Sequence, residues 1–468
     1  MASSTYTLSA VVLVLTVIVA VYYNRQQERE LDTILKALLR AEAKAVLAGP
    51  RRPRVAVGLG ACLDVRVDAL RLFRAIGYDS PSRARHHDVM TSEKDVRETF
   101  AYFFQASAAS ERYVSNRTLF NELLEAAKPI ALSHSILGGN AATMARRFAN
   151  EGCDVLLGAR MSQLTANVSL SPAVKLAANF VEEDDVHLCI EYNTADKWGR
   201  FASTRANRFY LHSDIHNPQL GSLNQFAEQL KSFSPSLVVI GGLQMMDNYP
   251  FRDGERQALI KRLADALASL PESTLVHFEM ASLTDHSLLD ELIRFLLPHV
   301  DSLGMNEQEL PNLISMLKFG NVTLLSEPIP RVASVLDEVR ALSDLLNVSR
   351  LHVHTLAFQA IVTVNGSPWR NSMAAAAKAS LTANRYVCNS ARVDLDKSRM
   401  LLDDSFSLSL RGNGERVFLE DTRPVACWKE RELEFCVAPG LVCTDVFQTS
   451  GCGDNISSAT LVAQFAAS

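Results

Sequence analysis

The residues best suited to chemistry in this 468-residue chain lie at positions 449–459, which read TSGCGDNISSA. Two glycines permit a tight turn, and the apolar periodic run after them predicts a helix start. Such a start presents free N–H groups and a positive dipole end, which together attract phosphate. Asp454 would lie in the first helical turn, where its carboxylate could accept a proton from a hydroxyl that attacks phosphorus. The segment alone favours a simpler interpretation, in which Asp454 caps the helix.

Two acidic clusters follow other apolar segments. Val276-His277-Phe278-Glu279 ends a predicted buried strand, and Asn306-Glu307-Gln308-Glu309 follows another apolar run. Ligands bind outside the carboxyl ends of strands in open α/β sheets, so these groups would face one crevice. A phosphate-bound Mg²⁺ needs few carboxylates and keeps several waters, a demand that Glu279 and Glu309 fit. Considered alone, each glutamate is more simply interpreted as a solvated or helix-capping residue. His277 is likewise more simply interpreted as a hydrogen-bonded core histidine than as a ligand.

Alternating apolar runs and helical patterns must position these groups. The run VAVGLG from Val55 predicts the first buried strand. Helices are predicted at Arg256–Ser269 and Ser287–Phe295. Strands are predicted at Val155–Leu157, Leu188–Glu191, Leu237–Ile240, Thr274–Phe278 and Leu351–His354. Strands that alternate with helices predict an α/β fold with a mostly parallel sheet covered on both faces.

Composition narrows the class of protein. The chain is 48% hydrophobic and 21% charged, which is typical of a globular protein. Its formal net charge of −5 lacks the basic excess that a nucleic-acid surface needs. The eight cysteines offer neither a disulfide scaffold nor a Cys-x-x-Cys zinc pair, although a few disulfides could form in an oxidising compartment.

The N-terminus differs from the rest of the chain. Leu8 to Tyr23 carries no charge, and its length lies between a signal-peptide core and a relaxed membrane helix. We interpret residues 1–24 as a signal-anchor or uncleaved signal, with a cleaved peptide as the alternative. Residues 25–54 predict a charged linker helix that is broken by Gly49, Pro50 and Pro53.

In chain order, the His277-x-Glu279 pair, the Asn306-x-x-Glu309 pair and the Gly451–Asp454 segment with Ala459 resemble the ADP-dependent glucokinase family, which belongs to the ribokinase-like superfamily. The resemblance covers the chain from about Val55 to its end, and the animal-type members of the endoplasmic reticulum look most similar. Further matching segments are Ala108–Arg112, Gly138–Ala141, Glu191-Tyr192, Ala206–Phe209, Gly241–Met246 and His352–Thr355.

The resemblance implies a role for each matching catalytic residue. Asp454 matches the family's catalytic base, and the backbone of Gly451, Cys452 and Gly453 matches an anion hole for the transferring phosphoryl group. Arg208 matches the arginine that grips the donor phosphates, for which a planar, permanently charged fork is well suited.

The resemblance also implies a cofactor and two substrate pockets. The cofactor is Mg²⁺, held largely through water by Glu279, Glu309 and Asn306. Positions bordering the adenine are matched by His354 and Val442. Positions that contact the sugar, where carboxylates and amides suit paired hydroxyls, are matched by Asp64, Glu111, Gly138, Gly139, Asn140 and Glu191.

The sequence departs from the family pattern beside the base. Cys452 stands where Leu or Ile is usual, and Ser450 replaces a usual valine. Both positions donate through the backbone, so the anion hole keeps its donors. Residues 405–430 match poorly, which leaves the adenine side less defined.

The implied function is phosphorylation of the 6-hydroxyl of glucose by ADP, giving glucose 6-phosphate and AMP. The alternatives are a phosphofructokinase relative and an ATP-using ribokinase-like sugar kinase. Within the family, a glutamate at the position of Glu111 favours unphosphorylated glucose. A non-enzyme alternative is a membrane-tethered sugar- or nucleotide-binding pseudokinase, although Asp454, Glu279, Glu309 and Arg208 are all present.

The implied architecture is a kinase domain over residues 55–468. A large nucleotide-binding core would carry a smaller α/β lid, inserted from about 62–130 and 183–235, that binds the sugar. The expected partners are glucose and ADP, with no nucleic acid and with membrane contact through the N-terminal segment only. We expect a monomer of the endoplasmic reticulum, in its lumen or anchored to its membrane, with secretion as the alternative.

Overall fold

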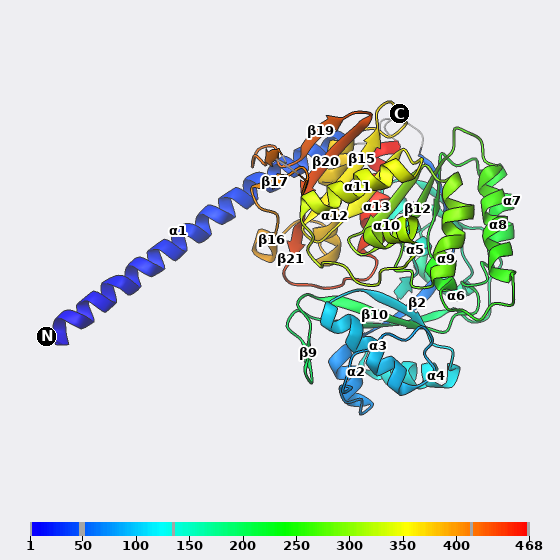
Figure 1. Cartoon of the computed structure of the whole chain (residues 1–468), viewed down its shortest axis with the longest axis horizontal. Coiled ribbons are helices and arrows are strands. Elements are labelled where there is room, and N and C mark those ends of the chain that lie inside the picture. Colours follow the sequence, from blue (N-terminus) through cyan, green and yellow to red (C-terminus); the bar gives the residue numbers. More distant parts are fainter. Residues whose placement is uncertain (1, 46–51, 133–135, 412–414, 466–468) are drawn as a thin grey trace.

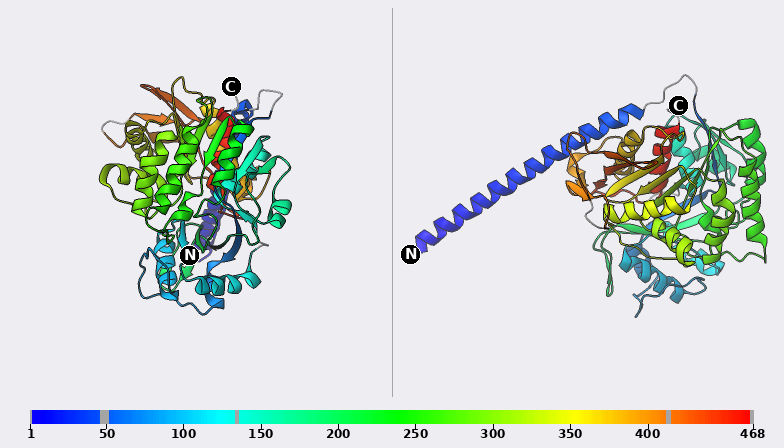
Figure 2. Two further views of the ribbon diagram at one scale, coloured as in Figure 1. Left: turned by 90° about the vertical axis from the view of Figure 1, so that its right-hand side faces the viewer. Right: turned by 45° about the horizontal axis from the view of Figure 1, so that its top comes forward.

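The computed structural model describes residues 2–45, 52–132, 136–411 and 415–465, and in the first helix it describes side chains for 14–22 and from 25 onward. The chain forms a large lobe and a small lobe, each around its own sheet (Figures 1 and 2). A long N-terminal helix projects away from the large lobe (Figure 1).

The larger sheet has ten strands among the described residues. Seven of them, from β6 to β14, pair in parallel, and the remaining pairs are antiparallel. This arrangement confirms the predicted α/β fold. In sheet order the strands are β19 (Ala426–Glu430), β20 (Leu433–Pro439), β15 (Phe358–Val364), β14 (Arg350–His354), β13 (Ser302–Asn306), β12 (Leu275–Glu279), β11 (Leu237–Ile240), β1 (Arg54–Gly58), β5 (Asp154–Gly158) and β6 (Val174–Leu176).

Helices cover both faces of this sheet because successive strand residues point to opposite sides. Ala56 packs in one core cluster, whereas Val55 and Val57 pack in another. The first face is covered by α7 (Leu223–Phe233), α8 (Glu255–Ala268), α9 (His286–Glu291), α10 (Glu309–Phe319) and α11 (Val332–Leu345). The second face carries α5 (Asn140–Asn150), α6 (Gln163–Ser169), α12 (Ser372–Val387) and α13 (Cys452–Phe465).

The small lobe is a five-stranded sheet with helices on its outer face. The strand order is β3 (Ser110–Tyr113), β10 (Asn207–His212), β7 (Val186–Tyr192), β2 (Cys62–Asp68) and β4 (Ile136–Gly138). One apolar core joins this sheet to α2 (Ala69–Ala75), α3 (Glu93–Ala106) and α4 (Arg117–Ala127). The described chain also forms three antiparallel two-stranded sheets, namely β8 (Lys197–Trp198) with β9 (Phe201–Ala202), β16 (Ser398–Met400) with β21 (Leu441–Cys443), and β17 (Ser405–Ser407) with β18 (Arg416–Phe418).

Helix α7, which the predicted boundaries include in the lid, packs on the large sheet instead. Its Phe226 lies against Gly58 and Gly158, and a side chain at Gly158 would place its Cβ 2.6 Å from that ring. The two glycines therefore make the groove into which α7 fits. The predicted helix Ser287–Phe295 is also divided, because α9 passes into a wider π-helical turn at Leu292–Leu296.

The first helix, α1 (Ala2–Glu42), joins the predicted N-terminal segment to the predicted linker. The C-terminal part of α1 packs on the large lobe, where Ile34, Leu35 and Leu38 contact α12. Glu42 accepts two hydrogen bonds from Arg385, at 2.8 and 3.0 Å. None of the described helices combines the length and hydropathy that a membrane crossing requires. The predicted break at Gly49 and Pro50 lies outside the described residues.

Candidate active site

A cavity of about 340 Å³ lies between the lobes, at the carboxyl ends of the parallel strands. It brings together residues that the sequence places far apart. The predicted site residues that line it are Asp64, Glu111, Gly139, Asn140, Arg208, Glu279, Asn306, Glu309, His354, Val442, Gly451, Cys452, Gly453 and Asp454. Gly138 and Glu191 are the predicted residues that do not line it.

The start of α13 forms one end of the cavity. Gly451 has a φ of +69°, and an added Cβ there would lie 3.0 Å from Thr143, so the turn requires glycine. Asp454 follows in the first turn, with 8% of its surface exposed. Burial raises the pKa of Asp454 to about 7, helped by the nearby charge of Glu279. A carboxylate with such a pKa can hold and release a proton near neutral pH.

The carboxyl ends of β12 and β13 supply the acidic residues of the cavity wall. Glu279 accepts from Ser457 Oγ at 2.9 Å and lies 2.9 Å from His277 Nε2. His277 is fully buried and bonds Ser302, which confirms the predicted hydrogen-bonded core position. Glu309 accepts from the backbone N–H and the side-chain amide of Asn306, at 2.9 and 2.8 Å.

These carboxylates fit the demands of a hydrated divalent cation. Glu279 and Glu309 are both buried in the cavity wall. Burial raises the pKa of Glu309 to about 7, so the ionised form lacks sufficient compensating charge. A cation in front of the two groups would supply that charge, and their oxygens retain lone pairs for its waters.

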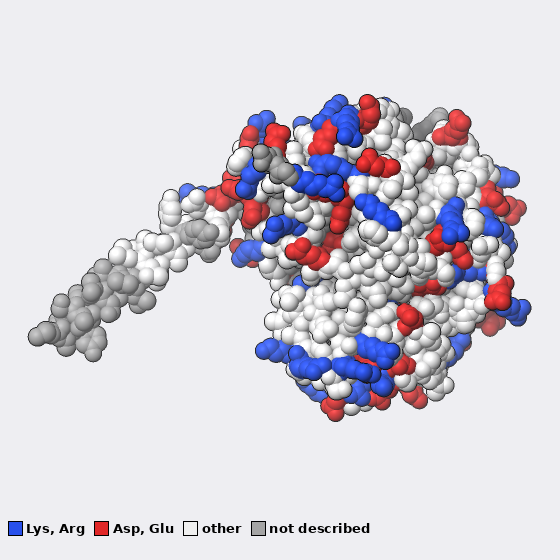
Figure 3. Space-filling view, in the orientation of Figure 1, with Lys and Arg blue, Asp and Glu red and all other residues white. Residues whose placement is uncertain are grey.

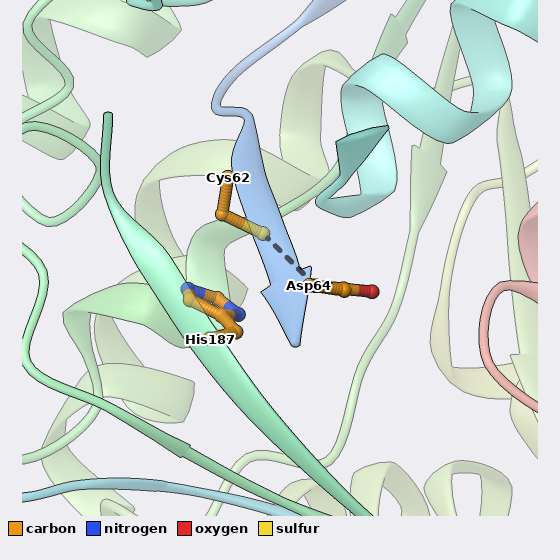
Figure 4. A group of neighbouring side chains, drawn as sticks. All are labelled: Cys62, Asp64 and His187. Atoms are coloured by element: carbon orange, nitrogen blue, oxygen red, sulfur yellow. Dashed lines mark hydrogen bonds between the residues drawn. The ribbon is translucent and has the colours of Figure 1, made fainter. Parts of the chain in front are cut away.

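The small lobe presents a polar face to the cavity because its strands alternate. On β2, Val65 and Val67 enter the small-lobe core, so Asp64 and Arg66 point to the other side. On β7 and β10 the same alternation turns a second group of side chains away from the small-lobe core, toward the large lobe: His187, Cys189, Glu191, Arg208, Tyr210 and His212. Figure 4 draws Cys62 and Asp64 on β2 beside His187 on β7, with the hydrogen bond from Cys62 to Asp64 dashed.

One hydrogen-bond chain connects the small lobe to Asp454. Gln244 Nε2 donates to Glu111 at 3.0 Å and to Asn140 Oδ1 at 2.6 Å. Asn140, the first residue of α5, donates in turn to Asp454 Oδ1 at 2.9 Å. Carboxylates on the sugar side and at the helix start are therefore held in one fixed arrangement.

The buried side chain of His187 lies in contact with the Glu111 carboxylate. His187 Nδ1 lies 3.1 Å from Glu111, and its Nε2 lies 2.9 Å from Asp214. Burial opposes a charge on His187, but Asp214 holds its pKa well above the usual value. Burial would likewise raise the pKa of Glu111, yet the hydrogen bond from His187 lowers it, so this carboxylate stays ionised.

Two arginines extend into the cavity from the small lobe. Arg208 Nη1 donates to Asn207 Oδ1 at 3.2 Å, whereas its buried Nε has no hydrogen-bond partner. An anionic ligand would satisfy such a donor. Arg205 is paired with Glu307 at 2.7 Å and donates to the Pro328 carbonyl at 2.9 Å, and so it joins the two lobes beside the cavity.

The two predicted sugar residues outside the lining have other contacts. A Cβ at Gly138 would lie 2.3 Å from Asp64 Oδ1, so this glycine makes room for the Asp64 carboxylate. Glu191 accepts a 2.7 Å hydrogen bond from Arg66. Neither contact follows from a motif, because both partners lie on neighbouring strands that are distant in sequence.

The two residues predicted to border the adenine lie on β21 and at the end of β14. Val442 and His354 both line the cavity, and the disulfide Cys388–Cys443 ties the end of α12 beside them. A second disulfide, Cys427–Cys436, crosses β19 and β20. Sequence reasoning overlooked His187, Tyr210, Gln244 and Arg205 as site residues; their period-2 placement on β7 and β10 was the available signal for the first two.

Comparisons with known proteins define the class. The family model described as the ADP-specific phosphofructokinase/glucokinase conserved region matches residues 53–463, so the chain belongs to this family. It is 32% identical to the ADP-dependent glucokinase of Bos taurus over 90% of this chain and 86% of that protein. It is 27% identical to a probable ADP-dependent glucokinase of Caenorhabditis elegans, over 94% of this chain and 91% of that protein.

A solved structure with the same fold supports the architecture. An ADP-dependent kinase in complex with fructose 6-phosphate and ADPβS superposes with a TM-score of 0.67, covering 94% of this chain and 98% of that one at 15% identity. The chain is thus a member of the ADP-specific phosphofructokinase/glucokinase family, as its motifs predicted, and it shares the fold of that ADP-dependent kinase.

Proposed function

We propose that this protein transfers the terminal phosphoryl group of ADP to the 6-hydroxyl of glucose. The observation that carries the proposal is the convergence of Asp454, Arg208 and the sugar-side carboxylates Asp64 and Glu111 on one cavity. It agrees with the ADP-dependent glucokinase activity named for the similar protein of Bos taurus and, as probable, for that of Caenorhabditis elegans.

The chemical step assigns each group a task. The glucose 6-oxygen attacks the β-phosphorus of ADP as the bond to the bridging oxygen breaks and AMP leaves. Asp454 accepts the hydroxyl proton, while the backbone N–H groups of Gly451, Cys452 and Gly453 stabilise charge on the transferring phosphoryl group. Arg208 supplies a fixed positive charge on the opposite side.

The proposed cofactor is Mg²⁺ in front of Glu279, Glu309 and Asn306. When bound, it would neutralise part of the charge on the donor phosphates. These residues would orient the waters of the ion, and Asn306 holds Glu309 in place through two hydrogen bonds. Closure of the small lobe would exclude water, which otherwise could accept the phosphoryl group.

Glu111 favours glucose over fructose 6-phosphate. Its carboxylate lines the cavity and is held ionised by His187. A phosphate already on the sugar would be repelled by that charge in a buried site. A phosphofructokinase activity is therefore the second candidate rather than the first.

The N-terminal helix supports the proposed anchoring in the endoplasmic reticulum. Its described apolar residues are exposed, with Val14, Ile18 and Tyr22 between 56% and 70% accessible. This stretch is free of charge, whereas positive and negative side chains are interspersed over the body (Figure 3). Such an exposed apolar stretch fits a membrane or a signal-recognition partner, and two disulfides fit an oxidising lumen.

The test is an assay of purified protein with Mg²⁺ and with glucose or fructose 6-phosphate as acceptor. ADP and ATP freed of contaminating ADP are compared as donors, and glucose 6-phosphate and AMP are quantified. We expect turnover with glucose and ADP, and its near loss in Asp454→Asn. Equal or faster rates with ATP would overturn the donor assignment, and faster rates with fructose 6-phosphate would overturn the acceptor assignment.

A further inference from the structure

Arg66 joins the small lobe to the loop that leads into α13. It lies on β2, and its side chain is only 2% exposed. Its Nη2 donates to the backbone carbonyl of Phe447 and to Glu191 Oε2, each at 2.7 Å. The guanidinium carbon also lies 5.5 Å from the centre of the Phe447 ring.

The loop that Arg66 contacts, residues 444–450, precedes the Gly451–Asp454 turn directly. On its other side this loop rests on α12, because the Phe447 N–H donates to Val387 O at 2.9 Å. Tyr386 OH donates to Ser450 O at 2.8 Å. The loop is therefore held by the large lobe on one side and by Arg66 of the small lobe on the other.

The strand that carries Arg66 also carries a sugar-side residue. Asp64 lies two residues earlier on the same face of β2, and it accepts a hydrogen bond from Ser450 Oγ at 3.3 Å. One strand thus carries a proposed sugar-binding residue and contacts this loop at two points, at Phe447 in its middle and at Ser450 where it ends. Movement of the small lobe relative to the large lobe would be transmitted to that loop through these two contacts.

The Arg66–Glu191 ion pair fixes the position of the guanidinium and adds little to the free energy of unfolding. A buried ion pair contributes little net stability, because desolvation of both charges opposes their attraction. Arg66 Nε and Glu191 Oε1 are also buried without hydrogen-bond partners. Glu191 does not line the cavity, and its carboxylate is linked through Arg66 to the Phe447 carbonyl in the loop before α13.

We propose that Arg66 is a positioning residue, held by Glu191, that fixes the loop 444–450 and thereby the start of α13 when the lobes come together over substrate. The proposal rests on the proposed kinase activity and adds a coupling between its sugar side and its phosphoryl-transfer side. Glu191 accordingly acts through Arg66, not by direct contact with the sugar.

The chain offers a matched control in Arg340. This arginine pairs with Glu430 at 2.8 Å, donates to the Leu408 carbonyl at 2.9 Å and lies 5.3 Å from the Phe435 ring. It thus has the same three kinds of partner, but the carbonyl to which it donates belongs to Leu408 and not to the loop 444–450 that precedes α13. Arg340→Ala reports the effect of losing such a pair on stability alone.

The kinetic test compares Arg66→Ala, Arg66→Lys and Arg340→Ala with the unchanged chain. A misplacement of about 1 Å can cost around 10²-fold in rate, so we expect kcat of Arg66→Ala to fall by about that factor while KM for glucose and ADP changes little. Arg66→Lys should fall between the two, and Arg340→Ala should keep its kcat. Unchanged kcat in Arg66→Ala, or an equal loss in Arg340→Ala, would overturn the proposal.

Glu191→Gln separates the two possible roles of that residue. Action through Arg66 predicts a lower kcat, no change in KM for glucose, and no further loss when combined with Arg66→Ala. A raised KM for glucose with an additive double variant would refute this role and show direct sugar contact.

Hydrogen exchange tests the coupling without turnover. We expect the amides of residues 444–450 to exchange several-fold faster in Arg66→Ala, but not in Arg340→Ala, with global unfolding rates matched. Unchanged exchange there would count against the proposal even if the enzyme is active. Absence of glucose phosphorylation by the unchanged chain would instead refute the proposed function, and the exchange result would still decide the coupling.

Discussion

We expect kcat/KM for glucose to rise about tenfold between pH 6 and pH 8, because Asp454 must lose its proton before it can act as a base. The pKa of Asp454 is raised to about 7, mainly by burial and further by the charge of Glu279. The deprotonated share is then about one-tenth at pH 6, about half at pH 7 and about nine-tenths at pH 8. The rate of phosphoryl transfer should follow that share, since kcat/KM reports the free enzyme.

Two variants test whether this titration belongs to Asp454. Asn140 donates to the carboxylate at 2.9 Å and so lowers its pKa, whereas Arg208 and His354 lower it by charge. Asn140→Ala should move the acid limb to higher pH in addition to weakening sugar binding. Asp454→Asn should lose about 10²–10⁴-fold in turnover, and its residual rate should lose the limb.

The assay measures initial rates from pH 5.5 to 8.5 at fixed free Mg²⁺, with ADP saturating and glucose well below KM. Titration of ADP itself would act equally on Asp454→Asn, which makes that variant the control. A flat profile in the unchanged chain, or an acid limb that persists in Asp454→Asn, would refute the assignment of the base.

Three further outcomes are expected. Glu279→Gln and Glu309→Gln should each raise the Mg²⁺ concentration needed for half-maximal rate, because each removes a charge facing the ion's waters; unchanged titrations for both would refute the metal site. Arg208→Ala should reduce kcat with ADP sharply, because it removes fixed charge beside the transferring group, and a rate near that of the unchanged chain would contradict this role. Deletion of residues 1–24 should leave the activity and the melting temperature unchanged. Leu38 is fully buried in the part of α1 that packs on the large lobe, so Leu38→Ala should lower the free energy of unfolding by about 2–5 kcal/mol, measured by thermal or denaturant unfolding.

We expect the preference for ADP over ATP to follow from the spacing of the groups that line the cavity. Arg208, the adenine-side residues Val442 and His354, and the start of α13 all line the same cavity. A donor with one more phosphate would displace either the base or the reacting phosphorus, and a shift of about 1 Å can cost around 10²-fold. Comparison of ADP and ATP rates measures this effect directly.

The sequence by itself determined the features that depend on local chemistry. Apolar runs between helical patterns specify the strands β5, β7, β11, β12 and β14, since side-chain periodicity is a property of neighbouring residues. Glycines before a periodic run specify the turn at Gly451 and the start of α13 at Cys452, which places Asp454 in the first helical turn. Carboxylates after two strands specify the wall formed by Glu279 and Glu309, because parallel strands end at one edge.

Only the tertiary structure decided which of these groups meet. Glu191 has a sugar-site motif in sequence, yet its partner is Arg66, 125 residues away, because β2 and β7 are neighbours in the small sheet. The chain from Glu111 through Gln244 and Asn140 to Asp454 joins four separate segments, so no local pattern encodes it. The docking of α1 on α12 likewise depends on an apolar surface of the large lobe to which α12, β15 and β20 all contribute.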